Sequence, residues 1–172
     1  MKKESLSAYD IQKLVEYRNI SKWVKISTPS IYKKVIQLEK KGLIRSQIEK
    51  DGKMPEKAIY SLTEAGINEF EKLMLEISSK PISIFLDFNA VIVNLEYMPE
   101  ESRKECLDQI ENNIITLKTY LEENLALKEA VSDIPVVGMA VLQQQFLLVQ
   151  AIETWIATLR KELENYNDGG SN

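Results

Sequence analysis

The sequence of 172 residues contains no histidine and a single cysteine, Cys106. Without histidine, a Ser-His-Asp catalytic triad and the usual zinc sites with histidine ligands are excluded. One cysteine cannot form a disulfide within the chain, and a lone cysteine on a charged helix is more often incidental than reactive. We therefore expect a protein that is not an enzyme and that holds no metal or cofactor.

Long apolar runs are also lacking. None matches the roughly 18 uninterrupted apolar residues of a membrane-spanning helix, and the start of the chain, Met1-Lys2-Lys3-Glu4, lacks the apolar core of a signal peptide. With 44% hydrophobic residues, the composition is that of a soluble globular protein. We expect a cytoplasmic protein of one domain or two small ones, with no membrane partner.

Charge divides the chain into two parts. Residues 1–80 hold 16 lysines and arginines against 11 acidic residues, whereas residues 81–172 hold 6 against 15. Ordinary surface charge is one explanation, because the excess of five positive charges is mild. The other is that the first part meets an anion and the second does not.

One segment of the basic part, Ile26 to Ile44, has the signals of a short helix with defined ends. Ser27 or Thr28 is suited to the N-cap, and Pro29 fits the first helical position. Gly42 suits the left-handed residue that ends the last turn. The segment therefore predicts one short helix that is capped at both ends.

The two faces of this helix differ in chemistry. Ile31, Val35 and Leu38 recur at spacings of four and three, which predicts a buried apolar stripe. The opposite face is polar, and no acid interrupts it before Glu39. It carries Lys33, Gln37 and Lys40, flanked by Ser30, Tyr32 and Lys34. Such a face can bind a polyanion.

The neighbouring segments predict a helix-turn-helix followed by a hairpin. Ser7 can cap a helix from Ala8 to about Tyr17, and Trp23, between the two helices, is expected in the core. Residues 43–48 and 58–62 predict two short strands, with Asp51-Gly52 and Pro55 as turn signals between them. The hairpin tip carries Lys50, Lys53 and Lys57, which suit phosphate contacts, although an ordinary solvated loop explains them equally well.

The rest of the chain predicts helices. One begins at Thr63-Glu64 with an apolar face, and the domain boundary is expected at Ser78 to Pro81. Residues 81–97 are apolar on all sides and predict a central helix. Two long helices follow, one opened by Pro99 and one running to about Asn165, each with apolar residues at spacings of three and four. The last helix is apolar on more than one face, which favours packing against its own chain and against a second copy.

Several motifs, taken in order, resemble the PadR family of bacterial transcriptional regulators, in particular the longer members with a C-terminal helical dimerisation domain. Residues Ser7-Ala8-Tyr9-Asp10-Ile11 resemble that family's Ser-Gly-Tyr-Glu/Asp-Ile, and Ser27-Thr28-Pro29-Ser30-Ile31-Tyr32 its lead into the recognition helix. Leu38-Glu39-Lys40-Lys41-Gly42-Leu43-Ile44 and Tyr60-Ser61-Leu62-Thr63-Glu64-Ala65-Gly66 are similar to the motifs before and after its wing. Residues 151–156 resemble its Glu-x-x-Trp-Leu segment.

The chain departs from this family at two places. An apolar first helix normally precedes the Ser7 motif, whereas only Met1 to Leu6 precede it here, so the first helix looks truncated and apolar surface is expected beside Ile11 and Leu14. Lys33 stands where the family usually has proline, which adds a cation to the groove-facing side.

The resemblance implies a mainly α fold with a small β-hairpin wing. Residues 1–78 form a winged helix-turn-helix domain, and residues 79–172 form a C-terminal α-helical domain for dimerisation and effector binding. A homodimer would place two recognition helices in successive major grooves of an inverted-repeat operator. The candidate DNA contacts are Thr28, Ser30, Tyr32, Lys33, Gln37, Lys50, Lys53 and Lys57.

Regulation is implied by the same resemblance. We expect a repressor that is released by a small aromatic or lipophilic effector, with Phe85, Phe88, Phe146 and Trp155 as candidate lining residues, although core packing also explains them. Two alternatives remain open. A winged helix can serve protein–protein contact without binding DNA, and Glu101 and Glu105 share a helix face as a carboxylate enzyme would require, although acids in a first helical turn are ordinary.

Overall fold

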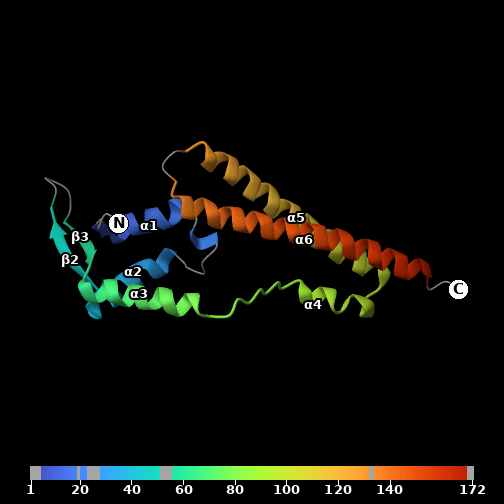
Figure 1. The fold of residues 1–172 in the computed structure, drawn as a ribbon, viewed down its shortest axis with the longest axis horizontal. Helices are drawn as coiled ribbons and strands as arrows, with labels where there is room; N and C mark the ends of the chain where they lie inside the picture. Colours follow the sequence, from blue (N-terminus) through green and yellow to red (C-terminus); the bar gives the residue numbers. More distant parts are fainter. Residues whose placement is uncertain (1–4, 19, 23–27, 51–55, 132–133, 170–172) are drawn as a thin grey trace. The chain divides into compact units, whose positions relative to one another are not determined.

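The computed structural model describes residues 5–18, 20–22, 28–50, 56–131 and 134–169. The chain forms two compact units, Met1–Ser83 and Ile84–Asn172 (Figure 1). Trp23, Ser27 and the turn signals Asp51-Gly52 and Pro55 lie outside the described residues, so the expectations placed on them stay predictions.

The first unit is a winged helix. It is mainly helical with a three-stranded antiparallel sheet in the order β1-β3-β2. Its elements are β1 (Leu6–Ser7), α1 (Ala8–Tyr17), the short 3-10 helix η1 (Ile20–Lys22), α2 (Thr28–Lys40), β2 (Ile44–Glu49), β3 (Lys57–Leu62) and α3 (Glu64–Ser78). The predicted helices and the hairpin are confirmed. The third strand, β1, was not foreseen, because two residues are too few to show a period.

The start of α1 is fixed by the cap that the sequence predicted. The Ser7 hydroxyl accepts a hydrogen bond from the Asp10 backbone N–H at 3.1 Å, while the Ser7 backbone N–H donates to the Asp10 carboxylate at 3.0 Å. This reciprocal capping box satisfies two backbone donors that the first turn leaves unpaired. Ser7 also pairs with Ile59 of β3, so the cap ties α1 to the sheet.

The core of this unit is small and partly open. Ile31 and Val35 of α2 are buried, as predicted, together with Ile59 of β3. Leu38, expected in the same stripe, is exposed. The reason is an apolar groove of about 320 Å³ between α1, α2 and the sheet, which Leu38 lines together with Leu6, Ile11, Val15, Ile31, Val35, Ile44 and Leu62.

The second unit begins differently from the prediction. The prediction of a central helix over residues 81–97 is wrong. Residues 81–86 have no regular structure, and only α4 (Asn89–Ile92) and the 3-10 helix η2 (Leu95–Tyr97) are helical. Pro81 lacks an N–H, three β-branched residues follow one another from Val91 to Val93, and Phe88 caps α4 without a side-chain hydrogen bond. High apolar content was mistaken for helical periodicity.

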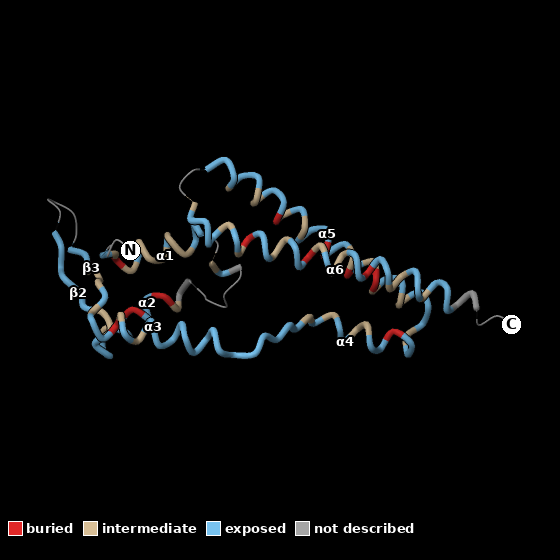
Figure 2. Tube along the Cα trace, viewed as in Figure 1, coloured by how far each residue is buried: buried red, intermediate tan, exposed pale blue. Residues whose placement is uncertain are grey.

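Two long helices form the core of the second unit, α5 (Glu100–Glu129) and α6 (Val136–Gly169). Pro99 is the N-cap residue of α5, in agreement with the prediction. The buried positions, drawn red in Figure 2, recur along both helices as the predicted apolar seams require, except that Leu117, expected in the α5 seam, is 49% exposed. They are Leu107, Ile110, Ile114 and Leu121 on α5, and Leu142, Val149 and Ile156 on α6. Leu95 of η2 joins this core, so the short elements cover part of the helical pair.

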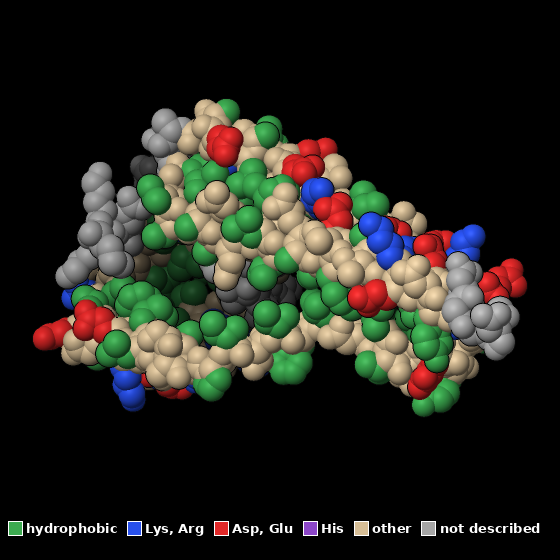
Figure 3. Space-filling model, turned by 45° about the vertical axis from the view of Figure 1, so that its right-hand side comes forward, with side chains coloured by type: hydrophobic (Ala, Val, Ile, Leu, Met, Phe, Trp, Pro, Cys, Tyr) green, Lys and Arg blue, Asp and Glu red, His purple; other side chains and the backbone are tan. Residues whose placement is uncertain are grey.

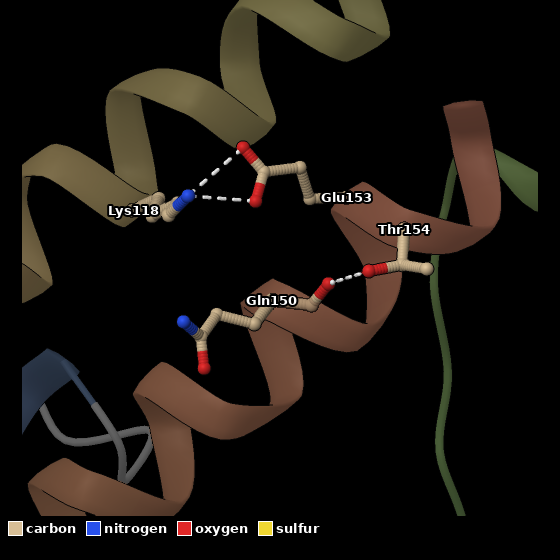
Figure 4. A network of polar contacts seen from close by, with 4 residues as sticks. All are labelled: Lys118, Gln150, Glu153 and Thr154. Atoms are coloured by element: carbon tan, nitrogen blue, oxygen red, sulfur yellow. Dashed lines mark hydrogen bonds and ion pairs between the residues drawn. The ribbon is translucent and has the colours of Figure 1, made fainter.

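Ion pairs join α5 to α6 beside the apolar seam. Lys118 donates to both carboxylate oxygens of Glu153, at 2.8 and 3.1 Å (Figure 4). This hydrogen-bonded partner raises the pKa of Lys118. Farther along, the Arg160 guanidinium contacts Asp108 at 2.5 Å and Glu111 at 2.9 Å. Charge pairs at two positions, together with the apolar seam, fix the register of the helical pair.

Much of α6 remains apolar at the surface. Leu147 and Leu148 are exposed, and Trp155 is 39% exposed. Figure 3 shows hydrophobic side chains reaching the surface on the face that it draws. By length and composition alone, Val136–Tyr166 could cross a membrane. A single helix of this kind is weak evidence for a membrane span, and Leu142, Val149 and Ile156 of this helix pack in the core with α5.

Candidate nucleic-acid interface

Helix α2 turns a polar face to solvent. Lys33 and Gln37 are exposed, as is the ring of Tyr32, while Ile31 and Val35 face inward. Because side chains one helical turn apart lie on the same side, Lys33 and Gln37 form one outward row. Lysine offers hydrogen-bond donors and glutamine an amide that both donates and accepts, and these are the groups that pair with base edges in a major groove.

The N-terminal end of α2 carries two further candidates. Ser30 is half-buried in the first turn. Thr28 is the first residue of the helix, and its side chain lies outside the described residues. Ser30 therefore sits at the edge of the polar face, and the phosphate role predicted for Thr28 stays a prediction.

The structure describes two of the three lysines that were predicted for the wing. Lys50 follows β2 and makes an ion pair with Glu56 at 3.6 Å between exposed side chains. Lys57 begins β3 and is exposed opposite Glu49 across the hairpin. Lys53 lies outside the described residues. Both described lysines thus have acidic neighbours. A DNA phosphate would have to compete with these carboxylates for the lysine ammonium groups.

The base of the hairpin adds a cation that sequence reasoning missed. Arg45 is exposed on β2, and its Nε donates to Ser61 on the neighbouring strand at 3.3 Å. The alternation of β2 could have indicated that Arg45 points away from the core. It lies one residue after Ile44, where the strand leaves the turn that follows α2.

An acidic group near the wing is held in its charged form. Hydrogen bonds from the Ser7 hydroxyl and then from the Ser7 backbone lower the pKa of Asp10, and the charge of Lys57 adds a smaller effect. Since Lys57 also interacts with this carboxylate, the start of β3 is electrostatically linked to the cap of α1.

The aromatic residues expected around an effector are only partly brought together. Phe88 and Trp155 stack, with ring centroids 5.9 Å apart, and Phe146 packs against the same apolar core. Phe85 is 87% exposed in the segment before α4. Among the described residues, no group of three or more histidine, cysteine, aspartate or glutamate side chains is placed to hold a metal ion.

Helices α1, α2 and α3 together with the two-stranded hairpin of β2 and β3 define a winged helix protein. In agreement, residues 6–80 match the family model described as "Winged helix DNA-binding domain". A comparison with curated protein sequences finds no match.

The whole chain, both units included, has the fold of PadR-type regulators. Bacillus subtilis PadR in complex with operator DNA aligns over 92% of this chain and 91% of its own, with a TM-score of 0.75 and 15% identity. The same regulator in complex with p-coumaric acid gives a TM-score of 0.74 at 15% identity, over 92% and 87%. The Vibrio cholerae virulence activator AphA gives 0.69 at 18% identity, over 95% and 92%. The resemblance read from the motifs is thereby confirmed for the fold.

Proposed function

We propose that this chain is a sequence-specific DNA-binding transcriptional regulator of the PadR type that acts in the cytoplasm. The observation that carries the proposal is the polar outer face of α2, with Lys33 and Gln37 exposed on a helix whose inner face is buried at Ile31 and Val35. A helix of this kind beside a wing is suited to a major groove. Solved PadR, similar in fold, is described in complex with operator DNA.

The contacts divide into two kinds. Lys33, Gln37 and Ser30 read base edges, and Gln37 is suited to adenine. Tyr32, Thr28, Lys50, Lys53 and Lys57 hold phosphates, which position the protein without carrying sequence information. The operator is an inverted repeat, because a homodimer presents two copies of α2 about 34–36 Å apart.

The dimer forms through the C-terminal helices. Support comes from the apolar surface that α6 leaves exposed outside its seam with α5, including Leu147 at 59% exposure and Leu148. Large exposed apolar patches mark interaction sites in soluble proteins. This unit is also where we place the effector.

The regulator is a repressor, released from DNA by a small aromatic or lipophilic effector that contacts Phe85, Phe88, Phe146 and Trp155. The stacked pair Phe88 and Trp155 supports an aromatic ligand, since such rings bind other rings in offset or edge contacts. The complex of PadR with p-coumaric acid supports a ligand of this class.

The test is binding of the purified protein to DNA from upstream of its own gene, titrated at two salt concentrations against a scrambled duplex. We expect preferential binding of the upstream duplex with a steep loss of affinity as salt rises, because each phosphate contact releases a counterion. Equal, weak binding to both duplexes would instead favour a winged helix that contacts proteins.

A further inference from the structure

The turn that ends α2 is bonded to several elements of the winged helix unit. Gly42 has a φ of +70°, its N–H donates to Glu39 O at 2.8 Å, and the Leu43 N–H donates to Leu38 O at 3.0 Å. The Thr63 hydroxyl, which caps α3, donates to Gly42 O at 2.7 Å. The end of α2 is therefore held by the start of α3 through backbone groups and one side chain.

A second tie joins α2 to the wing. Glu39 lies in the last turn of α2, and its Oε1 accepts a hydrogen bond from the hydroxyl of Ser46 on β2. Ser46 lies opposite Tyr60 in the ladder with β3, so it is part of the paired region of the hairpin. This side-chain contact bridges the helix and the strand across the turn that separates them.

Glu39 is the only acidic residue of the Thr28–Lys40 helix. A carboxylate on a helix that faces a polyanion weakens binding through repulsion unless it has another role. Its hydrogen bond to Ser46 supplies such a role, since a charged acceptor makes a stronger bond than a neutral one.

We propose that Glu39 is a positioning residue for DNA recognition, which acts through Ser46 to hold the wing at the angle where α2 and the wing lysines reach the same duplex. This inference rests on the proposed function. Glu39 itself touches no DNA; its effect is carried by the wing, which contacts phosphates through Lys50 and Lys57.

The proposal predicts an effect opposite in sign to simple electrostatics. Loss of a carboxylate near DNA should by itself strengthen binding, whereas loss of the tie should weaken it. For Glu39→Ala we expect operator affinity to fall about 3- to 10-fold, the scale of one charge-assisted hydrogen bond that is partly exposed. The slope of log affinity against log salt should drop by about one, because a wing phosphate contact is lost.

Four further variants separate positioning from folding and from charge. Ser46→Ala should reproduce the loss seen with Glu39→Ala, and the double variant should be no weaker than either single one, because both remove the same bond. Glu39→Gln keeps an oxygen acceptor and should retain the wild-type salt slope. Glu71→Ala removes an exposed acid from α3 and should lower neither affinity nor slope.

The variants are compared by fluorescence anisotropy on the operator and scrambled duplexes in the full-length dimer, with circular dichroism to confirm folding. Wild-type affinity or tighter binding in Glu39→Ala, or additive losses in the double variant, would overturn the positioning role while wild-type operator preference stands. If wild-type protein shows no operator preference, the proposed function fails, and the role of Glu39 fails with it.

Discussion

The rings of Phe88 and Trp155 stack with centroids 5.9 Å apart and an angle of 24° between their planes. Phe88 caps α4 and Trp155 lies on α6, so the contact joins the short elements of the C-terminal unit to its long helical pair. Trp155 is 39% exposed, which leaves part of the indole open to a ligand. The pair can therefore report on binding in this unit.

Trp155 fluorescence should respond to an effector. The chain has two tryptophans, so Trp23→Phe isolates the emission of Trp155. In that background, an aromatic acid that releases operator DNA should change the emission of Trp155. Phe88→Leu should lower the affinity for that acid about fivefold, because a ring contact is lost. Tyr166→Leu, at an exposed position of α6, is the control and should alter neither the emission change nor the affinity for the acid. Release of DNA without any change in emission would exclude Trp155 from the site.

Local signals accounted for most of the first unit. Ser7 caps α1 as expected, and Gly42 adopts the left-handed conformation expected after α2. Each depends on residues within one turn of each other, and so is visible in the sequence. The exposed placement of Lys33 and Gln37 followed from the helical period for the same reason.

What the sequence could not show depends on tertiary context. The tie between Glu39 and Ser46 depends on the path of the turn between them, and the open groove beside Leu38 depends on which elements cover α2. Residues 81–97 failed as a helix because apolar residues on all sides indicate burial but no period. Ion pairs such as that of Arg160 with Asp108 join residues 52 positions apart and leave no local pattern.

The wing lysines should contribute through phosphates alone. We expect Lys57→Ala to lower the salt slope by about one without changing the preference for operator over scrambled duplex. Glu56→Gln removes the partner of Lys50 and should raise affinity for both duplexes about equally, because it frees an ammonium group. Both effects are measured by anisotropy titrations at several salt concentrations. An unchanged slope for Lys57→Ala would reject its phosphate role.

The exposed face of α6 should control the oligomeric state. Leu148→Glu places a charge on that face and should shift the protein from dimer to monomer in sedimentation velocity, since burial of an unpaired carboxylate is costly. Glu162→Gln, an exposed position of the same helix, is the control and should keep the dimer. A dimer that persists in Leu148→Glu, and also in Leu147→Glu, would place the dimer contact elsewhere.

Acid should weaken the cap of α1. The pKa of Asp10 is lowered from its ordinary value of 3.8, so the folded state binds this proton less tightly than the unfolded state does. Its stabilising effect is therefore complete above about pH 4 and is lost as pH falls through the lowered pKa. Asp10→Asn should melt earlier than wild type at pH 6, and the gap should narrow toward pH 2. Thermal melts by circular dichroism test this, and a gap that is constant with pH would contradict it.

Substitution by alanine should lower the stability of the protein at Gly66 and raise it at Gly138. A Cβ at Gly66 would lie 1.9 Å from the Leu43 carbonyl oxygen, where α3 packs against the turn after α2. Backbone must move to relieve this, so Gly66→Ala should cost about 3 kcal/mol in the stability of the winged helix unit. At Gly138 in α6 the nearest atom is Cγ2 of Ile134 at 3.9 Å, an ordinary contact. Gly138→Ala should therefore stabilise α6 by about 0.5–1 kcal/mol through the better helix propensity of alanine. Urea denaturation of both variants measures the two changes in the free energy of unfolding. If Gly66→Ala is as stable as wild type, the close approach of α3 to the end of α2 is not maintained in solution, and the angle between the recognition helix and the rest of its unit is set by other contacts.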